Sequence, residues 1–209
     1  LDAAQSGITN SSIQALATSC PNLTELNVEA CAEVTDASIQ FVADKLPGLT
    51  ALDVGTDIIT DAAIQAVAAK CTGLIKLRVS GKSLTDASML AVADNCTALA
   101  KLCARLTDAS MLAVADKCSN LTVLVVIKGS SVTDAGIQAV AAKCPNLAFL
   151  DIHGTRNITD ASIDALAELC ANLKVLNVRA SATLTDAAIQ AALAKCPNLK
   201  LNQGQRYWW

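Results

Sequence analysis

The sequence is poor in aromatic residues, which make up 2% of its 209 residues, although 53% are hydrophobic. Its core must therefore be built from Leu, Ile, Val, Ala and Cys. It also lacks an excess of positive charge, because 16 Lys and Arg stand against 19 Asp and Glu. Binding to nucleic acid or to an acidic membrane surface needs a concentrated positive field, so we expect neither partner.

Long apolar runs are missing too. No segment reaches the roughly 18 consecutive apolar residues that a spanning helix needs, so no membrane insertion is predicted. The first residues, Leu1 to Gln5, contain no positively charged region followed by an apolar run, so no signal peptide is visible. We interpret them as the inside of a repeat and predict a cytoplasmic protein.

A Thr-Asp pair recurs along the chain, with Thr-Asn as its first variant. The threonines are Thr9, Thr35, Thr60, Thr85, Thr107, Thr133, Thr159 and Thr185, which lie 26, 25, 25, 22, 26, 26 and 26 residues apart. One such segment cannot bury its apolar face alone, so the segments must stack into a continuous core. We expect a single solenoid domain of about eight coils over residues 1–209. The step of 22 predicts a tight loop with a kink or a shortened strand near 96–107.

Each coil combines a helical and a strand pattern. In one coil Ile163, Leu166 and Cys170 share one helix face. The Thr or Asp before such a pattern can accept hydrogen bonds from its own helix's first turn, so we predict a helix from about each Asp to about the Lys before each Cys. A corner follows, and then a strand in which residues such as Leu150 and Ile152 alternate inward. Strands that each follow a helix in the same sense form a parallel sheet.

The pattern C-x-x-L-x-x-L-x-V-x-x-x-x-x-I-T-D-x-x-I-x-x-V-A extends from Ile8 to Leu201. It resembles the leucine-rich repeat of the cysteine-containing subtype. The resemblance implies an α/β fold, namely a right-handed leucine-rich-repeat solenoid with a parallel β-sheet on the concave face and α-helices on the convex face. We interpret residues 202–209, which end in Tyr207, Trp208 and Trp209, as a C-terminal cap or a truncated boundary.

The resemblance also implies a binding function. Arrays of this subtype occur in F-box substrate receptors and in the recognition portions of larger receptor-like or GTPase-containing proteins. The sequence contains no F-box, GTPase, kinase or nucleotide-binding segment of its own. The pathway to which the chain belongs therefore stays open.

Seven of the nine cysteines occupy one repeat position: Cys20, Cys71, Cys96, Cys118, Cys144, Cys170 and Cys196. Leu46 fills the same position once, which marks it as apolar and predicts buried thiols. Neighbouring helices pack roughly 8–10 Å apart, wider than the roughly 7 Å that a disulfide can bridge. Reduced cysteines agree with a cytoplasmic location. We interpret Cys31, in a loop, as structural.

Catalysis has little support in the sequence. His153 is the only histidine, and no Ser or Cys nucleophile lies beside it on the same strand face. A site formed by Cys103, Asp151 and His153 fails, since two strand intervals separate Cys103 from Asp151 by roughly 10 Å and metal ligands lie about 2.0–2.3 Å from a shared ion. The row of Thr-Asp carboxylates is explained by helix starts rather than by calcium. We predict no enzyme, no metal and no cofactor.

The outward strand positions differ most between repeats, and a partner can be recognised there. An acidic start is followed by a basic middle and by an apolar stretch, and exposed contiguous apolar area usually marks an interaction site. We predict a protein or peptide ligand on the concave face. The predicted binding residues are Lys76, Arg78, Lys101, Val123, Val125, Ile127, Phe149, Asp151, His153, Val175, Asn177 and Arg179.

Several alternatives stay open. The apolar outward positions also suit any strand, because β-branched residues favour strands. The chain fits the recognition part of an F-box-type ubiquitin ligase or of an immune or GTPase-linked receptor, and equally an engineered or purely architectural array. Exposed ends of a solenoid can stack, so an oligomer is possible although we do not predict one.

Overall fold

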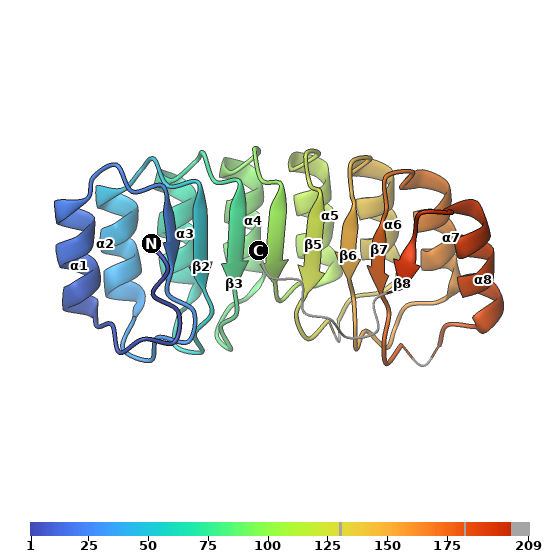
Figure 1. The fold of residues 1–209 in the computed structure, drawn as a ribbon, viewed down its shortest axis with the longest axis horizontal. Helices are drawn as coiled ribbons and strands as arrows, with labels where there is room; N and C mark the ends of the chain where they lie inside the picture. Colours follow the sequence, from blue (N-terminus) through green and yellow to red (C-terminus); the bar gives the residue numbers. More distant parts are fainter. Residues whose placement is uncertain (130, 182, 202–209) are drawn as a thin grey trace. The chain divides into compact units, whose positions relative to one another are not determined.

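The computed structural model describes residues 1–129, 131–181 and 183–201, in which helices and strands alternate along the chain (Figure 1). The helices are α1 (Asn10–Ser19), α2 (Asp36–Lys45), α3 (Asp61–Lys70), α4 (Asp86–Asn95), α5 (Asp108–Lys117), α6 (Asp134–Lys143), α7 (Asp160–Leu169) and α8 (Asp186–Lys195). The strands are β1 (Glu25–Asn27), β2 (Ala51–Val54), β3 (Lys76–Val79), β4 (Lys101–Ala104), β5 (Val123–Val126), β6 (Phe149–Asp151), β7 (Val175–Asn177) and β8 (Lys200–Leu201).

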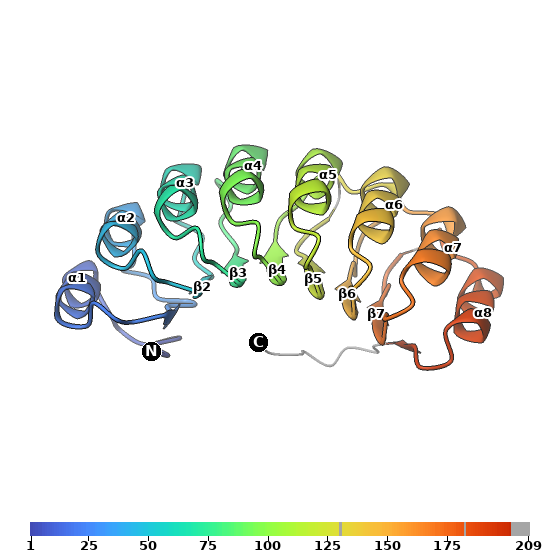
Figure 2. The ribbon, with the colours of Figure 1, turned by 90° about the horizontal axis from the view of Figure 1, so that it is seen from above.

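The chain divides into two compact units, Leu1–Arg105 and Leu106–Trp209. In the first unit β1 to β4 pair in parallel in chain order, and in the second unit β5 to β8 do the same. Within each unit the helices form one layer and the strands another (Figure 2). The predicted α/β solenoid with a parallel sheet is confirmed, whereas the single domain over 1–209 remains a prediction and the cap at 202–209 lies outside the described residues.

The predicted helix starts are confirmed from α2 to α8, each of which begins at the Asp of a Thr-Asp pair. The preceding Thr has an extended backbone, and in α3 its Oγ1 accepts a hydrogen bond from the N–H of Ala62. This is the usual function of an N-cap residue, because the first N–H groups of a helix have no partner inside it. Each helix ends one residue before the repeated cysteine position, as predicted.

The inward strand residues form the core, as the alternating pattern predicts. Leu52 and Leu77 pair across β2 and β3, and in the second unit Leu124 and Leu150 pair across β5 and β6, each at most 2% exposed. Val178 is the exception, because it is only half-buried. Val178 directly follows β7. The strand next to β7 on the C-terminal side, β8, has only two residues in the described part of the chain, so it covers Val178 incompletely.

The repeated cysteine position is buried in the interior coils and open at the first and last. Cys71 and Cys144 are fully buried, whereas Cys20 is exposed and Cys196 half-buried. All nine cysteines are thiols. The thiol of Cys71 also donates a hydrogen bond to the carbonyl of Leu46 in the preceding coil, with Sγ and O 3.4 Å apart. Cysteine at this position thus fills a small apolar space and satisfies a backbone acceptor.

The repeat near residue 100 is shorter than the others because its loop between strand and helix is shorter. β4 has four residues, as many as β2 and β3, so the predicted shortened strand is wrong. Only residues 105–107 separate β4 from α5. In this tight connection the N–H of Thr107 donates to Oγ of Ser110, 2.9 Å away, in a capping box. The predicted kink stays a prediction.

Candidate functional site

The candidate site lies on the sheet surface that, in each unit, faces away from the helices, and we call this surface the open face of that unit. In the second unit the strand register aligns its side chains into rows. The first row runs through Val123, Phe149, Val175 and Lys200, one residue from each of β5 to β8. The second row runs through Val125, Asp151 and Asn177. The sequence predicted all of these residues except Lys200 as outward, and the structure brings them together with Lys200.

Four apolar side chains of these two rows, together with Ile127 in the turn directly after β5, form what we call the apolar patch: Val123, Val125, Ile127, Phe149 and Val175. All five are half-buried, so each keeps some surface in contact with solvent. Adjacent strands in a sheet lie about 4.8 Å apart, so the row from Val123 to Val175 spans roughly 10 Å. The result is a contiguous apolar surface across three strands rather than isolated exposed residues.

Asp151 and Asn177 use their side chains within the protein. Oδ1 of Asp151 accepts a hydrogen bond from the N–H of His153 at 3.0 Å and lies 2.8 Å from His153 Nδ1. Oδ2 of Asp151 accepts from Nδ2 of Asn177 at 3.0 Å, and Oδ1 of Asn177 accepts from the N–H of Arg179 at 3.2 Å. These two residues therefore hold the ends of β6 and β7, and Asn177 is only 6% exposed. His153 and Arg179 are exposed.

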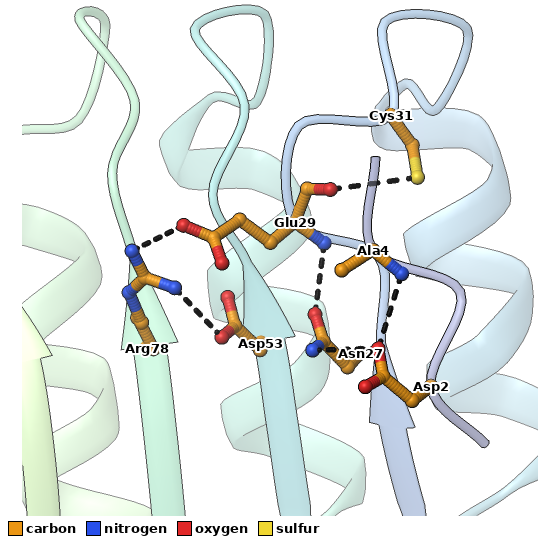
Figure 3. Close-up of polar contacts among 7 residues, drawn as sticks. All are labelled: Asp2, Ala4, Asn27, Glu29, Cys31, Asp53 and Arg78. Carbon is orange, nitrogen blue, oxygen red and sulfur yellow. Dashed lines mark hydrogen bonds and ion pairs between the residues drawn. The ribbon is translucent and has the colours of Figure 1, made fainter. Parts of the chain in front are cut away.

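The first unit has the same arrangement at its own edge. Nδ2 of Asn27 donates to Oδ1 of Asp2 at 3.0 Å, and Oδ1 of Asn27 accepts from the N–H of Glu29 at 2.9 Å (Figure 3). The Asp and Asn side chains thus recur as a device that satisfies backbone groups where strands end. Sequence reasoning missed it, although an Asp followed about one repeat later by Asn was visible.

Two of the three basic residues predicted in the first unit, Lys76 and Arg78, are paired with its acidic residues. Arg78 forms ion pairs with Glu29 and with Asp53, whose Oδ2 lies 3.1 Å from Arg78 Nη1 (Figure 3). The Arg78 side chain is 17% exposed. Nζ of Lys76 lies 3.7 Å from Oε1 of Glu25. The acidic start and the basic middle of the open face therefore neutralise each other.

Burial and ion pairing act in opposite directions on the charges of this cluster, and the outcome differs between Arg78 and Asp53. Burial would lower the pKa of Arg78, but its ion pairs with Glu29 and Asp53 outweigh that effect and raise it, so the guanidinium stays charged. Burial raises the pKa of Asp53 to about 6, in spite of the neighbouring Arg78. Oδ1 of Asp53 is buried and has no hydrogen-bond partner among the described residues, which explains why desolvation prevails.

The remaining predicted residues of this region lie on β4. Lys101 pairs in register with Lys76 and is half-buried. Cys103 lies beside Arg78 on the same face, but it is only 5% exposed. The outward position predicted for Cys103 is therefore correct in register, although neighbouring side chains cover the thiol.

Five of the seven aspartates of the Thr-Asp pairs accept hydrogen bonds from the Thr of the next coil, which corrects the interpretation that they serve only their own helix. Asp61 accepts from the N–H of Thr85 at 2.9 Å and from Thr85 Oγ1 at 2.5 Å. Asp108 and Thr133 repeat this contact at 2.9 and 2.6 Å. The contact also joins Asp36 to Thr60, Asp134 to Thr159 and Asp160 to Thr185. We call these contacts the Asp-Thr ladder.

The described residues contain no group of three or more His, Cys, Asp or Glu side chains arranged to hold a metal ion. In the same part of the chain no helix is long and apolar enough to cross a membrane. The predicted cytoplasmic location is not tested by either observation.

No protein-family model matches the sequence, and no curated protein is similar enough to count as a match. Solved structures do share the fold. A chain in a crystal structure of the Rad7 and Elc1 complex in yeast superposes with a TM-score of 0.78 and 23% identity, over 93% of this chain and 53% of that one. Internalin C2 from Listeria monocytogenes superposes with a TM-score of 0.58 and 19% identity, over 93% of this chain and 73% of that one. An internalin (inlF) from the same organism superposes with a TM-score of 0.58 and 18% identity, over 94% of this chain and 64% of that one. The protein thus spans about half the length of the yeast chain, and what it shares with these structures is the leucine-rich-repeat solenoid fold.

Proposed function

We propose that the protein is a non-catalytic module that binds a protein or peptide through its open face, with the apolar patch as the anchor. The observation that carries this proposal is the register of the second unit, which aligns Val123, Phe149 and Val175 across three adjacent strands. An accessible apolar centre with polar surroundings is the usual arrangement of a protein interface. Desolvation of this patch would supply most of the binding free energy.

The first unit contributes less in this proposal. Arg78 is held in two ion pairs and Lys76 lies near Glu25, so a ligand would have to displace these internal partners. Surface ion pairs contribute little, but a buried one costs more to break. We therefore place the main contact on the second unit and assign Lys76, Arg78 and Lys101 a secondary role.

The comparisons support a binding role without specifying it. One of the similar solved structures is a complex of two proteins, Rad7 and Elc1. Recognition within an F-box-type ubiquitin ligase and ligand sensing in an immune or GTPase-linked receptor are narrower versions of the same proposal. An engineered or purely architectural array is the competing hypothesis, and it predicts an open face that binds nothing.

The test compares the wild-type protein with a Val125→Asp, Phe149→Ala double variant in a pull-down from cell lysate, followed by affinity measurement with the recovered partner. We expect the double variant to lose about 2 kcal/mol or more, which is roughly a 30-fold weaker Kd. Leu169→Ala is the matched control, because Leu169 lies on α7 of the same unit and is 50% exposed. Equal binding by all three proteins would contradict the proposal.

A further inference from the structure

The charged side chains around the apolar patch are almost all basic. Lys200 lies next to Val175 in the first row and is exposed. Arg179 and His153 lie two residues beyond the second row, and Lys128 directly follows Ile127; all three are exposed. We call Lys128, Arg179 and Lys200, together with His153 when it is protonated, the basic rim.

One acidic residue, Asp151, stands among these open-face positions of the second unit. Its side chain is 15% exposed. Both of its carboxylate oxygens already accept hydrogen bonds, from His153 and from Asn177. Lys128 and Lys200, by contrast, form no ion pair within the described part of the chain. The charge offered to a ligand at this surface is therefore positive.

This excess of positive charge on the open face occurs in the second unit and not in the first. In the first unit the open-face cations Lys76, Arg78 and Lys101 are matched in number by Glu25, Glu29 and Asp53, and Lys76 and Arg78 pair with these carboxylates directly. The protein as a whole carries a formal charge of −3. A local excess of positive charge beside an apolar patch is thus a property of this surface and not of the composition.

We propose that the apolar patch and basic rim select acidic-apolar segments of a partner protein, in which Asp or Glu flanks a bulky apolar side chain. This inference rests on the function proposed above and adds the chemistry of the partner. The apolar side chain would lie over Phe149 and Val175, and the carboxylates would pair with the rim. Charge complementarity of this kind accelerates association and discriminates against basic segments.

The sheet geometry sets the spacing between anchor and carboxylate. Lys200 lies one strand from Val175, which is about 4.8 Å. Arg179 follows Val175 by four residues, two of them beyond the end of β7, so it lies at most roughly 13 Å away. An extended peptide advances about 3.3 Å per residue. A carboxylate one or two residues from the anchor therefore reaches Lys200, and one about four residues away reaches Arg179.

The experiment uses a random heptapeptide display library as the probe and the purified full chain as the target. We expect the selected peptides to be enriched in Asp and Glu within four residues of Phe, Trp, Leu or Ile. The Kd of a selected peptide, measured by fluorescence anisotropy, should weaken about five- to ten-fold with Lys200→Glu and similarly when salt rises from about 0.05 to 0.5 M. Lys117→Glu on α5, an exposed residue outside the open face, should leave the Kd unchanged.

The outcomes separate this inference from the proposed function. Suppose the selected peptides bind the Phe149→Ala variant more weakly but contain no acidic residues, or bind the Lys200→Glu variant as tightly as wild type. Either result would overturn the acidic-apolar selectivity but would still support binding at the apolar patch. Peptides whose binding ignores Phe149→Ala, or a library with no enriched sequence, would contradict both. Circular dichroism and the unfolding midpoint of each variant establish that it is folded.

Discussion

Removal of one carboxylate from the Asp-Thr ladder should destabilise the whole array, and Asp134→Ala is the sharpest test. Asp134 accepts hydrogen bonds from the N–H of Thr159 at 2.8 Å, from Thr159 Oγ1 at 2.7 Å and from Ser162 Oγ. All three donors belong to the start of α7, one coil further along the chain. The substitution therefore removes the carboxylate that joins α6 to α7, and the N–H of Thr159, the N-cap of α7, loses this hydrogen-bond acceptor.

The expected loss follows from the number and kind of these contacts. Hydrogen bonds to charged groups contribute about 1.5–3 kcal/mol when buried, but Asp134 is half-exposed and water replaces part of what is lost. We expect Asp134→Ala to lower the free energy of unfolding by about 2 kcal/mol. For a chain of this length that corresponds to a Tm lower by roughly 4–8 °C.

The chain provides its own control for charge. In the first coil Asn10 takes the place of Asp, and its side chain accepts from the N–H of Thr35 at 2.9 Å and donates to Thr35 Oγ1 at 3.0 Å. Asp134→Asn should therefore keep most of the contact and lose about 1 kcal/mol or less. The Asn variant separates the hydrogen-bonding geometry from the negative charge.

The pH dependence tests the charge directly. Burial would raise the pKa of Asp134, but the hydrogen bonds from Ser162 and Thr159 outweigh it and lower the pKa. A group with a lowered folded-state pKa stabilises the protein above its unfolded pKa, about 3.9, and loses that contribution as pH falls through the folded value. The difference between wild type and Asp134→Ala should thus be largest near pH 7 and shrink below about pH 4.

Urea unfolding followed by circular dichroism at pH 7 and pH 3.5 measures both effects. Three proteins suffice, namely wild type, Asp134→Ala and Asp134→Asn. A loss below about 0.5 kcal/mol for Asp134→Ala at pH 7 would refute the ladder as a source of stability. A difference of the same size at both pH values would refute the role of the charge.

Three further outcomes are expected. Arg78→Leu should lower the unfolding free energy by about 3 kcal/mol, since it leaves Glu29 and Asp53 facing each other without their cation, and the triple variant with Glu29→Gln and Asp53→Asn should regain much of it. Burial raises the folded-state pKa of Asp53 to about 6, so the stability that the protonated carboxyl contributes is present at low pH and lost as pH rises through 6. Urea midpoints measured from pH 4 to pH 7 should therefore decline less for Asp53→Asn than for wild type. Equal declines in the two proteins would argue against this. In the native protein a thiol reagent should label the exposed Cys20 first. Cys144 is fully buried, and burial raises its pKa to about 12, so it should react only after unfolding. Early labelling of Cys144, detected by peptide mass mapping, would show that its coil opens in the native protein.

Much of the local structure follows from the sequence alone. A Thr-Asp pair before an apolar helix pattern is a start signal that acts within a few residues, and every helix from α2 to α8 begins there. Alternating Leu and Val predict buried strand positions because side chains alternate between the two faces of a strand. The repeat period then predicts stacking, since a single coil has too little apolar surface of its own.

Contacts between coils follow from the register, which joins residues about 25 positions apart. The carboxylate of Asp61 is suited to its own helix, but strand pairing sets it against Thr85. The sequence likewise predicted Arg78 as an outward cation, and only the pairing of β1, β2 and β3 brings Glu29 and Asp53 to its guanidinium. A repeat pattern shows which residues are equivalent, whereas the alignment of neighbouring coils determines which of them touch, and that alignment depends on packing of the whole layer.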